Sequence, residues 1–362
     1  MNDQFPPPSL SNLGYTPTLA AELAELGAAA TPGRILRIDG HRALVLSQEG
    51  EQEATLPGRL RADPESAPTV GDWVALSPVA ATDRPVILAR LSRRTRLARG
   101  ASGTATRIQV IAANVDRVFI VMGLDGDFNP RRAERYLTIC GDAGVEAVLL
   151  LTKAGGCDDV GGRLAACRAI APPELVLGVH AIDVIDGINP DVPADYTGPG
   201  ITVALLGSSG AGKSTLLNHL LGRERMATAA VRSGDDRGRH TTTHRELVLL
   251  PSGGVLIDNP GMRELSLWLV GEGLERAFTD VESVARGCRF SDCSHNGEPG
   301  CAVQRAIDEG ELDGDRATSY TRLRDEAEAN ARRRDERSRR ADERSQSKLY
   351  RRFQKERRRR KG

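Results

Sequence analysis

The chain has 362 residues and a globular composition, with 40% hydrophobic and 27% charged residues. This length is sufficient for two or three domains with cores of their own. Aromatic residues make up only 4% of the chain, so the cores must rest on Leu, Val, Ile and Ala. No run of 18 apolar residues occurs, and residues 1–8 contain no basic region followed by an apolar stretch. These features argue against a membrane span and a signal peptide, and we expect a cytosolic protein.

The charge is divided unevenly along the chain, although the net charge is only +1. Residues 321–362 contain 18 Lys and Arg against 8 Asp and Glu, a net charge of +10, which leaves −9 for the rest. A basic tail on an acidic body favours a polyanionic partner, and we expect nucleic acid. A solvated tail that only aids solubility is the alternative.

The N-terminal third predicts an extension over residues 1–32, with a short helix at 18–27, and then a strand-rich domain over 33–99. Turn sequences separate its strands, as at Asp39-Gly40. Strands are expected at 34–38, 42–46, 72–76 and 86–89. Four or five short strands without a long helix fit a β-barrel of the OB type, and a small sandwich fits the same pattern.

Strands and helices alternate over residues 105–274. The expected strands are 118–122, 145–151, 175–179, 201–206, 246–250 and 254–258, and the expected helices include 131–141 and 161–170. Alternation of this kind predicts a parallel sheet covered by helices. Residues 275–362 are expected to form a third, helical and basic domain around a group of cysteines.

Residues 207–215 match G-x-x-x-x-G-K-[ST], the pattern of a phosphate-binding P-loop. An apolar strand precedes them and a helix follows, which is the context that the motif requires. Glycines let the backbone curl around a phosphate, N–H groups and the helix N-terminus face the anion, and Lys213 adds a positive charge. The predicted nucleotide-binding residues here are Gly207, Ser208, Ser209, Gly210, Ala211, Gly212, Lys213, Ser214 and Thr215.

A second phosphate-side motif is the apolar strand that ends in Asp258 and continues into Asn259-Pro260-Gly261. A strand-end Asp beside a P-loop holds Mg²⁺, usually through water, and Gly261 lets a backbone N–H approach the γ-phosphate. The polar stretch 238–243, Gly-Arg-His-Thr-Thr-Thr, is typical of a switch loop whose Thr completes the Mg²⁺ shell. The expected magnesium ligands are Ser214, Thr242 and Asp258, although the sequence does not distinguish Thr242 from its two Thr neighbours.

The sequence identifies the group that orients the attacking water less clearly than it identifies the phosphate-binding residues. Many GTPases place a Gln directly after the strand-end motif to orient water, but this chain has Met262 there. His240 in the switch loop is the nearest alternative for positioning water, beside Lys213 at the phosphates. We expect slow intrinsic turnover that a partner raises.

Thr152-Lys153-Ala154-Gly155 follows another apolar strand and resembles the base-reading pattern N/T-K-x-D. In that pattern the Asp accepts two hydrogen bonds from guanine and the Lys packs on the ring. Thr152, Lys153 and Gly155 are therefore predicted to face the base, but Gly155 lacks the carboxylate. Either Asp158 reaches back to supply it, or base specificity is relaxed.

The order of these motifs is unusual, because the base motif precedes the P-loop, whereas it follows the P-loop in ordinary GTPases. The sequence therefore predicts a circularly permuted GTPase domain. The permutation is physically allowed because the site lies at the strand ends of one sheet, whichever strand the chain enters first.

Four soft metal ligands occur within fourteen residues, at Cys288, Cys293, His295 and Cys301. Three thiolates and one imidazole suit a tetrahedral, closed structural site for one Zn²⁺ per chain. Free cysteines beside a surface His are the alternative.

Together these features resemble the small ribosomal subunit-dependent GTPase A family of circularly permuted ribosome-biogenesis GTPases. The resemblance covers 33–323. Its marks are 70–74 (Val-Gly-Asp-Trp-Val), 113–116 (Ala-Asn-Val-Asp), 128–132 (Phe-Asn-Pro-Arg-Arg), the P-loop, 238–243, Asp258-x-Pro260-Gly261-x-Arg263-Glu264, and the string from Cys293 to Val303. Two departures are Gly155 in place of the guanine-reading Asp, and Asn259 where Thr is common.

The resemblance implies an OB domain, a permuted GTPase domain and a zinc domain. It also implies binding to the small ribosomal subunit and its ribosomal RNA, and subunit-stimulated hydrolysis of GTP to GDP during late maturation. We expect a cytoplasmic monomer with Zn²⁺, with Mg²⁺ bound alongside GTP, and with no membrane partner. Two rivals remain: a P-loop NTPase of relaxed base specificity, such as a kinase or an ATPase, and a nucleotide-regulated RNA-binding protein without useful turnover.

Overall fold

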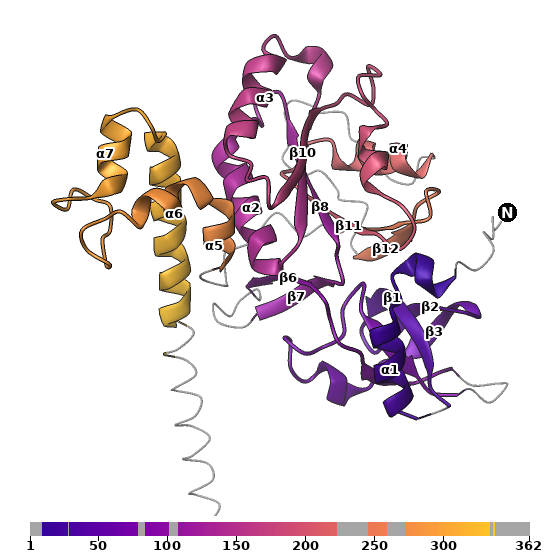
Figure 1. Ribbon diagram of the computed structural model, residues 1–362. Helices are drawn as coiled ribbons and strands as arrows, with labels where there is room; N and C mark the ends of the chain where they lie inside the picture. Colours follow the sequence, from indigo (N-terminus) through magenta and orange to yellow (C-terminus); the bar gives the residue numbers. More distant parts are fainter. Residues whose placement is uncertain are drawn as a thin grey trace, which may run out of the picture.

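The computed structural model describes residues 9–27, 29–78, 84–100, 108–222, 245–258, 272–333 and 336. A strand-rich N-terminal body, a central α/β body and a set of C-terminal helices follow one another along the chain (Figure 1). The central body lies between the other two, so both of its neighbours are attached to the same sheet-and-helix framework (Figure 1).

The N-terminal body is a five-stranded barrel with strand order β3-β2-β1-β4-β5. Its elements are η1 (Leu10–Leu13), α1 (Pro17–Glu25), β1 (Thr31–Asp39), β2 (Arg42–Ser47), β3 (Gly50–Thr55), η2 (Gly58–Arg61), β4 (Trp73–Leu76) and β5 (Ile87–Arg90). A parallel bridge between Thr55 and Val86 connects the two edge strands, and Thr55 N donates to Pro85 O at 2.8 Å. This closure confirms the OB-type barrel over the sandwich.

Two parts of this region were not among the predicted strands. Strand β3 is rich in Glu and Gln on its exposed face, so it lacks the apolar alternation that marks its neighbours. A separate antiparallel hairpin, β6 (Arg96–Gly100) and β7 (Ile108–Ala113), follows the barrel and precedes the central sheet.

The central sheet has the strand order β10-β9-β8-β11-β13-β12. The strands are β8 (Arg117–Gly123), β9 (Glu146–Thr152), β10 (Val176–Ala181), β11 (Thr202–Leu206), β12 (Glu246–Leu249) and β13 (Val255–Asp258). The P-loop strand β11 lies between β8, which precedes it in sequence, and β13, which follows it. This arrangement is the permuted topology that the order of motifs predicted.

The prediction of a fully parallel sheet was wrong at one edge. Strand β12 pairs antiparallel with β13, while the other strands of this sheet are parallel. Only the short loop 250–254 joins these two strands, and a connection of that length cannot carry the chain back for a parallel pairing.

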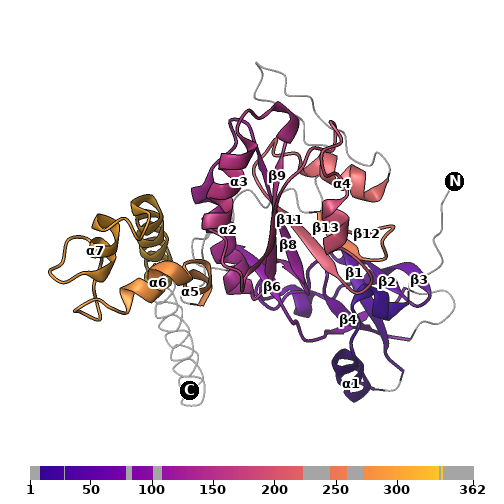
Figure 2. The same cartoon turned by 45° about the horizontal axis from the view of Figure 1, so that its top comes forward.

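Helices cover both faces of the sheet, with α2 (Pro130–Ala143) and α3 (Val160–Ala169) on one face and α4 (Lys213–Leu221) on the other (Figure 2). Alternate residues of β8 separate accordingly. Val118 and Ile120 belong to the cluster that includes α2, whereas Phe119 and Val121 pack in the cluster that includes α4. Between these elements lie the short turns η3 (Ala154–Gly156) and η4 (Val192–Tyr196).

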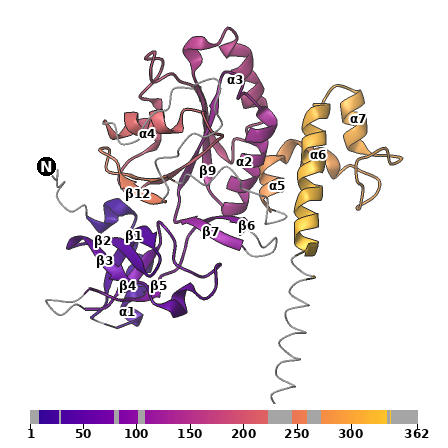
Figure 3. The ribbon, with the colours of Figure 1, turned by 180° about the vertical axis from the view of Figure 1, so that it is seen from behind.

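The C-terminal helices are α5 (Glu272–Ala277), α6 (Thr279–Ala285), α7 (Ala302–Asp308) and a long helix over 314–333. They lie beside α2, on the side away from the N-terminal barrel (Figure 3). Among the residues that the structure describes, no helix combines the length and hydropathy needed to cross a bilayer.

A buried arginine connects the barrel to the central sheet. Arg34 of β1 is 1% exposed, and its guanidinium donates to Thr202 Oγ1 of β11 at 2.8 Å and to backbone carbonyls that include Gly71 O. Burial lowers the pKa of Arg34 to about 10, so the group remains charged at neutral pH. Gly71 has φ +88°, and a Cβ there would meet the Ala113 carbonyl carbon at 3.3 Å and its oxygen at a shorter distance. The close approach of this barrel residue to the end of β7 therefore requires glycine at this position.

A second buried arginine connects the central body to the C-terminal helices. Arg316 donates to Glu134 Oε1 of α2 at 3.1 Å and makes two hydrogen bonds to the Asp280 carboxylate of α6. Its guanidinium also lies over the Phe278 ring, 4.6 Å from the centroid. Burial raises the pKa of Glu134, while the neighbouring Arg131 and Arg316 oppose the shift.

We expect the Arg316→Ala substitution to lower the free energy of unfolding by about 3–5 kcal/mol, because it leaves Glu134 buried without this partner. Arg135→Ala, on α2 directly after Glu134, is the matched control. It removes a half-exposed ion pair with Glu326, and we expect it to cost about 1 kcal/mol or less. Urea denaturation followed by circular dichroism measures both, and equal losses would contradict a special role for Arg316.

Candidate nucleotide-binding site and Cys/His metal site

The P-loop runs from the end of β11 to the start of α4 and uses glycine where the backbone requires it. Gly210 and Gly212 have φ of +76° and +92°, values that side chains rarely allow. A Cβ at Gly207 would meet the Val121 carbonyl carbon at 3.2 Å and its oxygen at a shorter distance. The loop therefore passes close beside β8 and then leads into the N-terminus of α4.

The side chains of Lys213 and Ser208 hold the P-loop in place by hydrogen bonds. Lys213 Nζ donates to Gly207 O at 2.9 Å and also to Ser208 O. Ser208 Oγ donates to the Asp127 carboxylate, at 2.5 and 2.6 Å from its two oxygens. Asp127 follows β8, so this contact fixes the P-loop against the loop after the neighbouring strand.

The predicted base motif lies directly beside the P-loop. Thr152 is 6% exposed, and its Oγ1 donates to Ala211 O of the P-loop at 2.7 Å. Lys153 follows with φ +61°, and its ammonium pairs with Asp125 at 2.6 Å. Partial burial raises the pKa of Asp125, but the hydrogen bond and charge of Lys153 and the backbone N–H of Asp127 together outweigh this effect, and the net pKa lies below its ordinary value. The two predicted motifs, far apart in sequence, therefore form one continuous edge.

The remaining predicted residues divide into two groups. Asp258 ends β13, whose Ile257 is in register with Ala204 of β11, so Asp258 lies at the same sheet edge as the P-loop. Gly155 lies in the exposed turn η3 directly after β9. Ser214 and Thr215 lie in the first turn of α4, after Ser209 in the loop. His240, Thr242 and Gly261 lie outside the described residues.

Three carboxylates at this edge were missed by the sequence analysis: Asp125, Asp127 and Asp183. The first two follow the apolar strand at 118–122 and the third follows the strand at 175–179. Carboxylates directly after buried parallel strands were the available signal, because the ends of such strands meet at one edge of the sheet.

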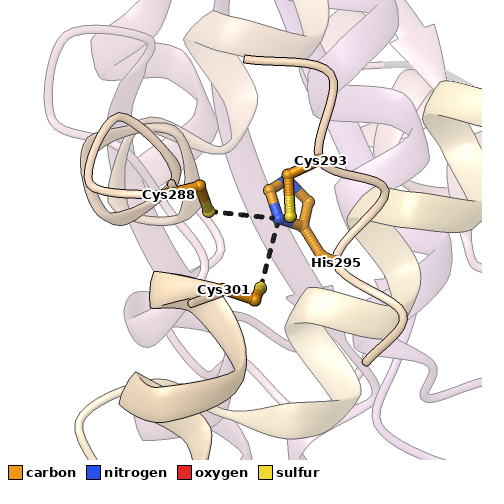
Figure 4. A group of neighbouring side chains, drawn as sticks. All are labelled: Cys288, Cys293, His295 and Cys301. Carbon is orange, nitrogen blue, oxygen red and sulfur yellow. Dashed lines mark hydrogen bonds between the residues drawn. The ribbon is translucent and has the colours of Figure 1, made fainter. Parts of the chain in front are cut away.

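The second site is the Cys/His cluster near the start of α7. The three Sγ atoms of Cys288, Cys293 and Cys301 and a ring nitrogen of His295 all lie within 4.8 Å of one another. The Sγ atoms of Cys288 and Cys301 each lie 3.6 Å from His295 Nδ1 (Figure 4). Sulfur ligands of a tetrahedral Zn²⁺ are separated by ~3.8 Å, given Zn–S bonds of about 2.3 Å. The cluster therefore has the donor set and the spacing for one four-coordinate ion.

Backbone hydrogen bonds favour thiolate at one of these sulfurs. Burial raises the pKa of Cys288, but the N–H groups of Ala302 and Val303, together with hydrogen bonds from Cys293 and Cys301, outweigh burial and hold the pKa below its ordinary value. Ala302 N lies 3.4 Å from Cys288 Sγ. Metal binding requires the thiolate, so these donors favour a ligand at this position.

The ligand loop is also fixed by contacts behind the cluster. Glu298 accepts hydrogen bonds from the backbone N–H groups of Ser294 and Asn296, both at 2.8 Å. Arg324 of the helix over 314–333 donates to Ser294 O at 3.0 Å. The ligands are therefore held by the C-terminal helices as well as by each other.

Comparison with known proteins gives a consistent assignment. The family model of the RsgA GTPase matches residues 90–268. The "Small ribosomal subunit biogenesis GTPase RsgA" of Xanthomonas euvesicatoria pv. vesicatoria is 44% identical over 329 residues, 88% of each chain. The chain belongs to the RsgA GTPase family. The RsgA protein of Xylella fastidiosa is 52% identical over 71% of this chain and 73% of its own length.

Solved structures resemble this RsgA family member in fold. YjeQ from Thermotoga maritima has a TM-score of 0.60 at 23% identity and covers 82% of this chain and 98% of its own. The circularly permuted GTPase YloQ has a TM-score of 0.57 at 20% identity, over 83% of this chain and 96% of its own. These comparisons confirm the permuted three-part fold that the sequence predicted.

Removal of one ligand of the Cys/His cluster tests the metal site of this RsgA family member. We expect the intact chain to hold roughly one equivalent of zinc and the Cys293→Ser variant to lose most of it, because three ligands remain for a four-coordinate ion. Cys157→Ser, outside the cluster, is the control and should retain its zinc. Metal content is measured by mass spectrometry after dialysis. Equal zinc in both variants would argue against this ligand set.

Proposed function

We propose that this chain is a GTP phosphohydrolase that binds the small ribosomal subunit and acts in its late maturation, with turnover stimulated by that subunit. The observation that carries the proposal is the joined nucleotide edge, where Thr152 bonds to Ala211 and brings a base motif against a P-loop. The RsgA relatives, named for small-subunit biogenesis, support the same reaction and the same partner.

Different residues at this edge contact different parts of the nucleotide. Lys213 and the P-loop amides of 207–215 contact the β- and γ-phosphates, and Lys153 packs against the base. Ser214, Thr242 and Asp258 are the residues that would hold Mg²⁺, and Gly261 directs a backbone N–H to the γ-phosphate. When bound, Mg²⁺ neutralises charge that develops between the β- and γ-phosphates.

His240 orients the attacking water in this proposal, because Met262 cannot do so. Its place in a Thr-rich stretch next to Thr242 puts water positioning and metal binding on one segment. A switch of this kind would make turnover depend on the partner, since contact with the subunit would position both groups at the γ-phosphate.

The other two bodies supply partner contacts. The barrel and the basic tail 321–362, with a net charge of +10, would contact ribosomal RNA through its phosphates. The Cys/His cluster would hold a structural Zn²⁺ that fixes the fold of the C-terminal helices. A monomer in the cytoplasm, where small subunits mature, fits these contacts.

Phosphate release from GTP, with and without purified small ribosomal subunits, tests the proposal. We expect stimulation by the subunit, and we expect Lys213→Ala to reduce the stimulated rate by roughly 10²–10³-fold, because it removes a preorganised positive charge at the phosphates. His219→Ala, in the last turn of the same helix, is the control. Absence of any stimulation would favour a nucleotide-regulated RNA-binding protein instead.

A further inference from the structure

The loop after β10 is held against the base motif by one buried carboxylate. Asp183, which is 8% exposed, accepts a hydrogen bond from Gly155 N at 3.1 Å through Oδ2. Its Oδ1 accepts from the backbone N–H groups of Ile185 and Asp186, at 3.0 and 3.1 Å. Asp183 therefore joins the turn that contains Gly155 to the loop that contains Asp186.

This loop is also closed at its base by backbone hydrogen bonds. Asp183 N donates to Ile188 O at 2.7 Å, and Ile188 N donates to Asp183 O at 2.8 Å. Asn189 Nδ2 adds a bond to Ala181 O at 3.1 Å. The position of residue 186 is consequently set by the backbone, and a change of its side chain leaves these bonds in place.

The Asp186 carboxylate occupies the space beside Gly155. An ideal Cβ at Gly155 would lie 2.9 Å from Asp186 Cγ and closer still to Oδ2, and both distances are shorter than van der Waals contact. A side chain at residue 155 would begin at this point, so any residue other than glycine there would force the Asp186 carboxylate to shift. Asp186 is exposed, so its carboxylate is accessible to a ligand at the edge of the sheet.

Neighbouring carboxylates already have other roles. Asp125 pairs with Lys153, and Asp127 accepts from Ser208 and pairs with Arg132. Asp159 is the N-cap of α3 and accepts from Gly162 N at 2.8 Å. Asp158, the residue that the sequence suggested, is exposed on the loop after Gly155.

We propose that Asp186 supplies the guanine-reading carboxylate that Gly155 lacks. The assignment rests on the proposed GTPase function and specifies how that site recognises its base. The two oxygens of Asp186 accept hydrogen bonds from guanine N1–H and from the 2-amino group, while Lys153 covers the ring. The carboxylate has moved from the strand β9 loop to the strand β10 loop, and base specificity is retained rather than relaxed.

The Asp186→Asn variant of the full chain tests this assignment, with GDP, XDP and ADP as ligands in titration calorimetry. An amide offers one acceptor and one donor, which fits xanthine N1–H and its 2-carbonyl but not guanine. We expect GDP affinity to fall roughly 10- to 100-fold, since a charge-assisted pair of hydrogen bonds is lost, and XDP affinity to rise. Asp158→Asn should change neither, and a transfer of preference to XDP in that variant would overturn the assignment.

A rescue experiment provides a second, independent readout. Gly155→Asp alone should weaken GDP binding, because two carboxylates would share one space. Gly155→Asp combined with Asp186→Ala moves the carboxylate back to residue 155 and should restore GDP preference over ADP. Failure of the double variant to exceed Asp186→Ala alone would also count against the proposal.

Nucleotide binding by the unmodified chain distinguishes failure of the proposed function from failure of the Asp186 assignment. If it binds ADP as tightly as GDP, the guanine-specific function itself is wrong. If it prefers GDP and Asp186→Asn leaves that preference unchanged, only the assignment of Asp186 is wrong. Unfolding midpoints equal to that of the unmodified chain show that each variant is folded.

Discussion

The carboxyl edge of the central parallel sheet is the constraint on which the nucleotide site depends. Every loop that leaves a parallel strand leaves it at the same edge, so segments that are remote in sequence become neighbours there. The hydrogen bond from Thr152 Oγ1 to Ala211 O joins two such segments, the base motif and the P-loop. This constraint also explains why permutation is tolerated, because the edge is the same whichever strand the chain enters first.

Buried arginines attach the other two bodies to this framework in fixed orientations. Arg34 joins the barrel to β11, and Arg316, which also bonds to Asp280 of α6, joins the C-terminal helices to α2. Such groups require several partners at once, which disfavours other relative placements of the bodies. The chain passes from β13, which ends in Asp258, to α5, so the nucleotide edge and the C-terminal helices are close neighbours in sequence. A conformational change at the phosphates could therefore be transmitted through a short stretch of chain to the C-terminal helices that carry the Cys/His cluster.

Local sequence patterns predicted the strands, the P-loop and the Cys/His site, because each of these depends on chemistry among residues that are close together in the chain. The P-loop glycines, the apolar strands and the four Cys/His ligands each act through near neighbours in the chain. The strand β12 illustrates the limit, since its apolar pattern predicted a strand correctly but not its antiparallel direction. The polar strand β3 was missed because its place in the barrel is decided by pairing with β2 rather than by hydrophobicity.

The sequence by itself determined the class of the protein: a P-loop with a preceding base motif, a β-rich N-terminal body and a soft-ligand cluster. Only the tertiary structure decided which groups meet. From sequence, Gly155 was a missing carboxylate, and Asp158 was the nearest replacement along the chain. In the folded protein Asp183 brings the loop of Asp186 into the space beside Gly155. Proximity across two neighbouring strands depends on their register and on loop closure, and neither can be read from a local pattern.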